Sequence, residues 1–239
     1  MRSVASTLLD KNSPPLGRAL AGALFAKVED AGSAARAFTM AAAAAPDFLA
    51  PILLNAELRA QAGDSDGATA ILREYLSRHA GSDRARLALA RLEAENGALK
   101  SAAENFAKIP PQTIFSDETL AALYGAAAKA AGGPARATML ETARASASTP
   151  RIQGIALATA GDNEGAAAAL RRAMLAGSGD DDLARLYHDV MSALGRAEEA
   201  ASLLAEIERR RNPAAGVADP EGGSAEARKI ADFEVNIRQ

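Results

Sequence analysis

Residues 63–83 read GDSDGATAILREYLSRHAGSD, and this stretch decides the fold. Gly63 and Asp64 are typical of one helix ending and another beginning. Glycine tolerates the left-handed backbone conformation, and an aspartate accepts hydrogen bonds from the unpaired amides of a first turn. Apolar side chains then recur at helical spacing, at positions 68, 71, 72, 75 and 76. The segment HAGSD at 79–83 interrupts this pattern and starts a further helix. The stretch therefore predicts the turn and second helix of a helical hairpin.

Versions of this stretch recur along the chain. Candidate turn glycines follow one another at spacings of 31, 34, 35, 29 and 34 residues: Gly32, Gly63, Gly97, Gly132, Gly161 and Gly195. Five residues after each glycine stands an alanine: Ala37, Ala68, Ala102, Ala137, Ala166 and Ala200. Nine residues after each glycine the side chain is apolar in five of six cases, the sixth being Glu141: Ala41, Leu72, Phe106, Leu170 and Leu204. Seven residues before each glycine, the residue is small in four of six cases: Phe25, Ala56, Ala90, Gly125, Gly154 and His188. A small residue where two helices cross, with a large one a turn later, is the pattern of closely packed hairpins.

The composition favours many stacked helices over one globular core. About a quarter of the 239 residues are alanine, the strongest helix former, while Trp is absent and the chain has only 3 Tyr and 6 Phe. A core so poor in aromatic residues must be built from many small Ala and Leu contacts. No strand pattern precedes the C-terminal stretch. We therefore predict an all-α fold, an α-solenoid of about six antiparallel helical hairpins.

The expected organisation has three parts. Residues 1–15, which end in Ser-Pro-Pro, are expected to be a flexible lead-in, 16–212 the helical repeat domain, and 213–239 a linker with a short C-terminal docking segment. Prolines at 46, 110, 111 and 150 fall at boundaries between hairpins, as helix breakers should. The six hairpins are expected at 16–46, 47–80, 82–110, 116–148, 150–177 and 180–211.

This pattern resembles the tetratricopeptide repeat family, in a degenerate bacterial form. The family's unit has about 34 residues in two antiparallel helices, with Gly at the turn, Ala early in the second helix and often Pro at the end. The segment from Gly195 through Ala200 and Leu204 to Pro213 matches it best, and the resemblance covers about 16–212. The chain departs from the family in lacking its Trp and most of its first-helix aromatics, and in the Ile-Pro-Pro at 109–111 that shortens the third repeat. Phe25 and His188 also stand where a small residue is expected.

The resemblance implies a concave face, built from the first helices, that grips an extended peptide or a helix of a partner. Carried onto this chain, it predicts eight partner-binding residues: Glu57, Arg84, Leu87, Arg91, Lys129, Arg151, Ile155 and Arg185. Five of the eight are basic. If they converge, we expect an acidic or carboxylate-ended partner segment, because arginine pairs with such groups bidentately. An ordinary charged helix face explains the same residues equally well. The family's ordered clamp for acidic C-terminal peptides is not reproduced.

Catalytic and metal chemistry are not indicated by the sequence. Cysteine is absent, and the only histidines are His79, at a helix end, and His188, whose neighbour Asp189 points about 100° away along the helix. The run of aspartates at 180–182 is interpreted as a helix N-terminus, because a calcium loop would need further oxygen ligands. No phosphate-binding glycine loop occurs. We expect no enzyme activity, and we assign no cofactor, metal or catalytic residue.

Charge and hydropathy restrict the partners and the compartment. A net charge of −3 gives no positive field for nucleic acid. The longest apolar run, 40–46, is far shorter than the roughly 20 residues of a membrane span. The expectation is a cytoplasmic protein, or a periplasmic one if a leader was removed.

The sequence therefore predicts a protein–protein interaction scaffold or adaptor, such as an assembly factor or an accessory subunit of a larger complex. A secretion or envelope-biogenesis chaperone and a non-catalytic regulatory subunit of an enzyme remain as alternatives. Near the C-terminus, apolar residues fit either a helical stripe or a strand alternation: Ile230, Phe233, Val235 and Ile237. This segment is expected to cap the solenoid, to occupy its groove as an inhibitor, or to dock onto a partner.

Overall fold

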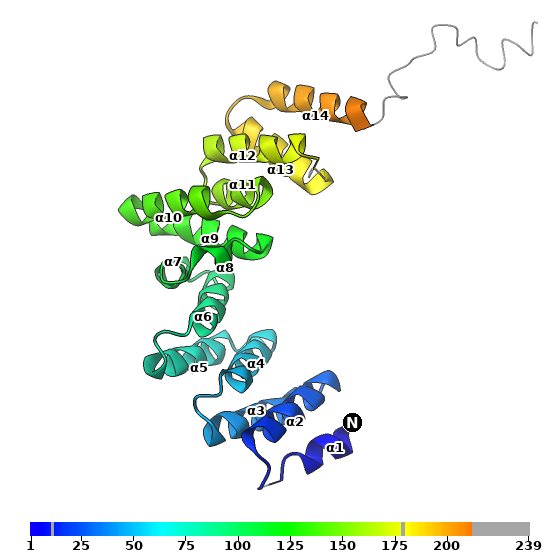
Figure 1. The fold of residues 1–239 in the computed structure, drawn as a ribbon, viewed down its shortest axis with the longest axis vertical. Coiled ribbons are helices and arrows are strands. Elements are labelled where there is room, and N and C mark those ends of the chain that lie inside the picture. Colours follow the sequence, from blue (N-terminus) through cyan, green and yellow to red (C-terminus); the bar gives the residue numbers. More distant parts are fainter. Residues whose placement is uncertain (11, 178–179, 212–239) are drawn as a thin grey trace, which may run out of the picture. The chain divides into compact units, whose positions relative to one another are not determined.

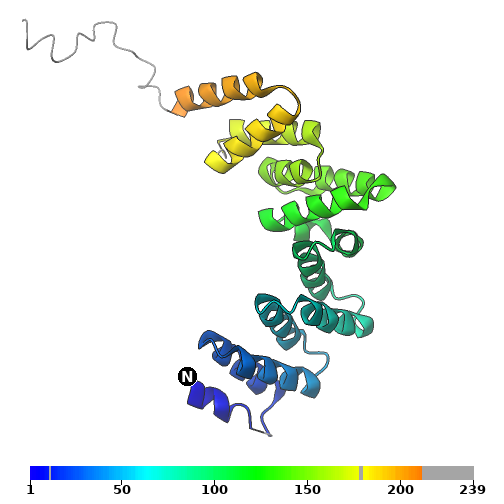
Figure 2. The ribbon, with the colours of Figure 1, turned by 180° about the vertical axis from the view of Figure 1, so that it is seen from behind.

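The computed structural model describes residues 1–10, 12–177 and 180–211. These residues form fourteen helices and no strand (Figure 1), so the all-α prediction is confirmed. The chain divides into two compact units. Unit 1, Met1–Gly179, contains α1 to α12, and unit 2, Asp180–Gln239, contains α13 and α14. Seen from behind in Figure 2, the helices of unit 1 again follow one another in sequence order.

Each of the six predicted hairpins corresponds to one pair of helices. Two short helices, α1 (Arg2–Thr7) and α8 (Pro111–Ile114), lie outside the pairs. Within unit 1 the pairs are α2 (Pro15–Lys27) with α3 (Ala31–Ala44), α4 (Leu49–Gln61) with α5 (Ser65–Arg78), α6 (Asp83–Glu95) with α7 (Leu99–Phe106), α9 (Glu118–Ala131) with α10 (Gly133–Ser146), and α11 (Pro150–Thr159) with α12 (Asn163–Leu175). Unit 2 contributes α13 (Asp181–Ala193) with α14 (Ala197–Arg211).

Five of the six hairpin turns share one backbone geometry. The turn residue adopts a positive φ, between 59° and 82°, and the amide of the next residue donates to the carbonyl five residues earlier. These bonds measure 2.7–3.0 Å, and they join residue pairs 30 and 25, 64 and 59, 98 and 93, 162 and 157, and 196 and 191. The arrangement is a Schellman turn, which satisfies carbonyls left unpaired at the end of a helix. In three of the turns the donating residue is an aspartate whose carboxylate also caps the next helix: Asp30, Asp64 and Asp162.

The first turn corrects the predicted register. Its positive-φ residue is Glu29, at 59°, whereas Gly32 lies inside α3. The spacing to Gly63 thereby becomes 34 residues, matching the next interval. The small and large residues of the first crossing are then Gly22 and Phe38, and a Cβ on Gly22 would lie 2.5 Å from the Phe38 ring. Phe25 therefore no longer departs from the repeat pattern, because the small residue at the crossing of the two helices is Gly22.

The pairing of a small and a large residue is confirmed in the fifth hairpin. A Cβ on Gly154 would lie 2.5 Å from Leu170 Cδ2. Five of the six alanines predicted five residues after a turn glycine are fully buried: Ala37, Ala68, Ala102, Ala166 and Ala200. In unit 2 the predicted close-approach residue His188 is instead exposed, and its neighbour Tyr187 is buried.

The register correction predicts opposite effects for two glycines. Gly32→Ala is expected to stabilise unit 1 by up to about 1 kcal/mol, because Gly32 is helical and nothing lies within 4 Å of the position that an added Cβ would occupy. Gly63→Ala is expected to destabilise it by about 1 kcal/mol, because its φ of 82° strains any residue with a Cβ. Urea unfolding of both variants measures the difference, and a loss of stability in Gly32→Ala would restore Gly32 as the turn residue.

The fourth hairpin departs from the pattern. Gly132 and Gly133 both adopt positive φ, at 67° and 48°, and Gly132 itself precedes the first residue of α10. As a result, the predicted crossing alanine, Ala137, is exposed, and so is Glu141. Buried contacts come from Met139 and Ala143 instead. The prediction for Ala137 was wrong because the second glycine rotates the start of α10.

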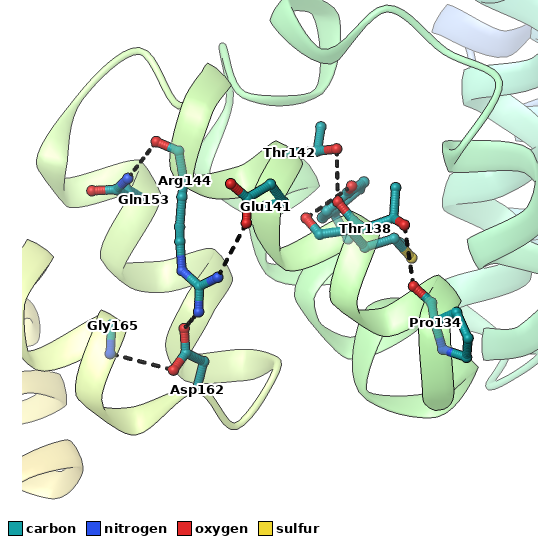
Figure 3. A network of polar contacts seen from close by, with 10 residues as sticks. Pro134, Thr138, Glu141, Thr142, Arg144, Gln153, Asp162 and Gly165 are labelled. Carbon is teal, nitrogen blue, oxygen red and sulfur yellow. Dashed lines mark hydrogen bonds and ion pairs between the residues drawn. The ribbon is translucent and has the colours of Figure 1, made fainter.

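Polar contacts help to hold α10 against its neighbours in unit 1. Figure 3 shows Arg144 of α10 reaching Asp162, whose carboxylate caps α12 through the Gly165 amide. The Arg144 Nη2 to Asp162 Oδ2 distance is 2.6 Å, and the Arg144 carbonyl accepts a 2.7 Å hydrogen bond from Gln153 Nε2. Arg136 also donates to the Ala160 carbonyl at 2.9 Å. These bonds replace part of the Ala/Leu packing that the fourth hairpin lacks.

A buried carboxylate links three helices in the middle of unit 1. Glu93 of α6 is 3% exposed. One of its oxygens accepts a 2.7 Å hydrogen bond from Arg73 Nη2 of α5, and the other a 2.8 Å bond from Asn105 Nδ2 of α7. Both carboxylate oxygens are thus satisfied, as burial of a charge requires.

A short helix lies within residues 1–15, the segment expected to be a flexible lead-in. Helix α1 forms there, and Ala5 is fully buried. Leu8 and Leu9 pack against the apolar cluster that contains Phe25 and Phe38. The segment therefore covers apolar surface of the first hairpin. The expected linker and docking segment at 213–239 lie outside the described residues.

The segment that begins with Ile-Pro-Pro at 109–111 and ends at Phe115 fills the core next to α9. After α7 ends, the chain places Ile114 and Phe115 in buried positions. The Tyr124 ring of α9 makes edge contacts with Phe106 and Phe115, at centroid distances of 5.6 and 5.0 Å. Its hydroxyl donates to the Met139 carbonyl at 3.2 Å. The segment after α7 thus adds Phe115 to an aromatic contact between α7 and α9.

The buried phenol of Tyr124 should make the protein less stable at high pH. Burial raises the pKa of its phenol from 10.0 to about 12, against the opposing effect of a hydrogen bond with Thr142. Between these two pKa values the folded chain retains a proton that the unfolded chain releases. The contribution of the Tyr124 phenol to the free energy of unfolding is therefore intact below pH 10 and declines as the pH rises toward 12. Urea unfolding at about pH 9 and about pH 11 should show a smaller decline for Tyr124→Phe than for the unchanged protein. Equal declines in the two proteins would contradict the attribution of this loss of stability to Tyr124.

Candidate partner-binding groove

A groove of about 580 Å³ lies in unit 1 where α4, α6 and the start of α9 meet. We call it the α4–α6–α9 groove. Leu72, Ala56 and Leu92 form a buried floor, and Leu53, Leu87 and Leu120 are partly exposed along it. The remaining lining residues are Glu57, Arg84, Ala88, Arg91, Glu95, Asp117 and Thr119.

The first-helix pattern explains why these side chains meet. Leu53 and Leu87 both lie ten residues before a turn glycine, and Glu57 and Arg91 both lie six residues before one. Helices α4 and α6 are the first helices of successive hairpins, so equivalent positions present equivalent faces. A smaller cavity of about 220 Å³ shares Glu57, Arg91, Leu92 and Glu95 and continues the groove toward the ends of α4 and α6.

Four of the eight predicted residues come together in this groove: Glu57, Arg84, Leu87 and Arg91. Its charge is mixed, because two arginines face the three carboxylates of Glu57, Glu95 and Asp117. The sequence projection selected the arginines and missed Glu95 and Asp117. It also missed Leu53, although Leu53 lies at the same offset from its glycine as Leu87.

The four other predicted residues lie outside the groove. Arg151 is only 21% exposed at its side chain, and its Nε lies 2.6 Å from Glu118 Oε1, in an ion pair that joins α11 to α9. Lys129 is exposed near the turn at Gly161, and Ile155 is partly exposed on α11. Arg185 belongs to unit 2 and lies 3.5 Å from Asp182 of its own helix. Ile230, Phe233, Val235 and Ile237 lie outside the described residues.

The charged groups of the groove differ in how they are engaged. Asp117 caps α9 by accepting the Leu120 amide at 2.9 Å. Arg91 Nε lies 3.5 Å from Glu95 Oε1 on the same helix face, with both side chains nearly half exposed. Within the described part of the chain, Glu57 and Arg84 make neither an ion pair nor a hydrogen bond through their side chains. These two side chains are available to a ligand.

A further cavity, of about 350 Å³, lies between α5, α6 and α7. Its lining includes Arg73, Glu93 and Asn105, which satisfy one another by hydrogen bonding. The polar groups there serve the packing of the three helices.

The residues considered for chemistry take structural positions. The His79 ring stacks on Tyr75, with ring centroids 4.3 Å apart. His188 Nδ1 lies 3.7 Å from Asp189 Oδ1, too far for a hydrogen bond, and both side chains are well exposed. Asp180 caps α13 by accepting the Leu183 amide at 2.9 Å, which confirms the interpretation as a helix N-terminus.

Metal-ligating side chains are dispersed in the described part of the chain. Over 1–10, 12–177 and 180–211, no three His, Cys, Asp or Glu side chains are grouped so that they could hold a metal ion. Among the helices described, none combines the length and the apolar character needed to cross a membrane.

Comparison with family models and with curated protein sequences yields no match. Among solved structures, the chain is similar to a tetratricopeptide repeat protein from Parabacteroides merdae, with a TM-score of 0.55 and 14% identity over 86% of this chain and 79% of that one. It also aligns with the APC/C hetero-tetramer Cut9–Hcn1, with a TM-score of 0.48 and 16% identity over 89% of this chain. This second alignment covers only 43% of the other chain. The similarity to the Parabacteroides protein shows that the fold is a tetratricopeptide-like α-solenoid.

Proposed function

We propose that this chain is a protein-interaction scaffold that holds a segment of a partner protein in the α4–α6–α9 groove, as an assembly factor or accessory subunit of a larger complex. The observation that carries the proposal is the convergence of partly exposed leucines from three separate helices onto one groove. Partly exposed apolar side chains gathered in a concavity are typical of sites that bind another molecule.

The proposed role is binding without catalysis. His79 stacks on Tyr75 and its Nε2 lies 3.1 Å from Asp47 Oδ1, and His188 lies on an exposed helix surface. The groove itself contains arginines, carboxylates, a threonine and apolar residues, with no histidine or cysteine. Its mixed charge favours a partner segment that carries both signs over the acidic or carboxylate-ended segment expected from the sequence.

Leu87→Asp should abolish partner recovery. An aspartate at this position places an uncompensated charge against the apolar surface that a partner would cover, so affinity should fall by at least about tenfold. The measurement is an affinity pull-down from the native organism followed by mass spectrometry.

The matched control is Leu54→Asp. Leu54 lies on α4, is 39% exposed and does not line the groove. It should leave partner recovery unchanged, and both variants should melt close to the unchanged protein. Equal recovery of the same partners by the Leu87 variant would exclude the groove as the binding site.

A further inference from the structure

Arg84 and Glu57, the groove residues whose charged side chains are unpaired in the described part of the chain, carry opposite charges. Arg84 is the second residue of α6 and Glu95 the last, so the rise of about 1.5 Å per residue separates them by about 16 Å along the helix. Glu57, on α4, shares the smaller neighbouring cavity with Glu95, which places both carboxylates toward the same end. Asp117 and Thr119, at the start of α9, also line the groove.

The internal contacts leave this polarity in place. The Asp117 carboxylate, which also lines the groove, caps its own helix by accepting the Leu120 amide, and Arg84 makes no ion pair or hydrogen bond through its side chain in the described part of the chain. At the opposite end, Arg91 is paired with Glu95, so one carboxylate there, that of Glu57, is not balanced. The dipole of α6 reinforces this arrangement. Its positive end lies at Arg84, and its negative end lies at Glu95, near Glu57.

The apolar floor between the ends favours a helical ligand. Its lining consists of Leu and Ala side chains, which offer no partners for the amides of an extended peptide. A helix satisfies its own backbone and can bury an apolar stripe at i, i+3, i+4 and i+7. A length of about 16 Å corresponds to about three helical turns.

We propose that the partner segment is an amphipathic helix of about three turns with a basic end and an acidic end, seated with its acidic end at Arg84 and its basic end at Glu57. This inference rests on the proposed function, because it specifies the ligand of the same groove.

The test uses three stapled helical peptides with the same leucine stripe and matched helicity by circular dichroism. One carries Lys at one end and Glu at the other, one carries Lys at both ends, and one carries Glu at both ends. Fluorescence anisotropy with the full chain at low salt should show that the bipolar peptide binds about fivefold to tenfold more tightly than either of the others, with the preference weakening in high salt.

Charge reversal in the protein should redirect the preference. Arg84→Glu should favour the peptide with Lys at both ends, and Glu57→Lys the peptide with Glu at both ends. Both positions are exposed, so folding should be retained, and circular dichroism checks it.

Three results would overturn the inference in distinguishable ways. Equal binding of all peptides, unaffected by either reversal, removes the polarity and leaves groove binding intact. If no peptide binds while Leu87→Asp still loses the native partner, the ligand is not a helix. If no peptide binds and Leu87→Asp retains the partner, the proposed function itself fails.

Discussion

Replacing Gly125 by alanine is expected to lower the free energy of unfolding of unit 1 by about 3 kcal/mol. Gly125 lies on α9 where that helix meets α11. A Cβ there would collide with the Ala156 carbonyl oxygen and lie 2.9 Å from Thr159 Cβ. A backbone oxygen cannot rotate away as a side chain can, so the two helices would have to separate. The loss should weaken the packing of α9 against α11, a contact that is more extensive than that of α9 with α10.

Urea unfolding followed by circular dichroism measures this effect, and Gly17→Ala is the matched control. Gly17 is also helical, but its added Cβ would meet only Pro14 and Ser13 at ordinary distances of 3.5 Å or more. The control should be neutral or slightly stabilising, because alanine is the better helix former. If Gly125→Ala unfolded at the same urea concentration as the control, the close approach of α9 and α11 would be wrong.

Glu93→Ala is the second change with a large expected effect, a loss of about 3 kcal/mol. The substitution removes two charge-assisted hydrogen bonds and leaves the partly buried Asn105 amide without its carboxylate partner. It also leaves a cavity between α5, α6 and α7. Arg73→Ala should cost less, because the Arg73 side chain is 58% exposed and water can replace its ion pair.

Glu95→Ala provides the control for Glu93 on the same helix. The Glu95 side chain is 45% exposed and pairs only with Arg91 at 3.5 Å, so its removal should change stability by less than about 0.5 kcal/mol. Thermal melting of the two variants should therefore differ by several degrees. Similar melting temperatures would mean that the buried carboxylate does not hold the three helices together.

The hairpin order could be predicted because each turn is encoded locally. Glycine at 63, 97, 161 and 195 adopts the positive φ that its position predicted. The alanine five residues later is buried each time, since the Schellman turn fixes where the second helix begins. Sequence pattern and geometry coincide at these four turns.

The pattern failed where another residue took the turn or where the turn changed. Glu29 adopts a positive φ, a conformation that is unusual for a residue with a Cβ. The glycine pattern therefore pointed to Gly32, the nearest glycine, instead. The pair Gly132–Gly133 shifted the start of α10 and exposed Ala137. Neither outcome follows from composition, because both depend on which residue of the turn adopts the positive φ.

The groove could be predicted only in part. The first-helix offsets selected Glu57, Arg84, Leu87 and Arg91, which line one groove in the structure. They gave no account of Arg151, because its ion pair with Glu118 depends on how α9 and α11 stack across a repeat boundary. The mixed charge was missed for the same reason, since Asp117 reaches the groove from a helix that follows an irregular insertion.

Site-specific photo-crosslinking tests the central claim, that the partner binds the first-helix face at the groove, most directly. A photoreactive phenylalanine analogue is placed at Leu87 in one variant and at Glu74, on α5 with a 73% exposed side chain, in another. Irradiation in the native organism should give a discrete cross-linked partner from position 87 and none from position 74. Cross-linking of the same partner from position 74 alone would contradict the claim and place binding on the second-helix face.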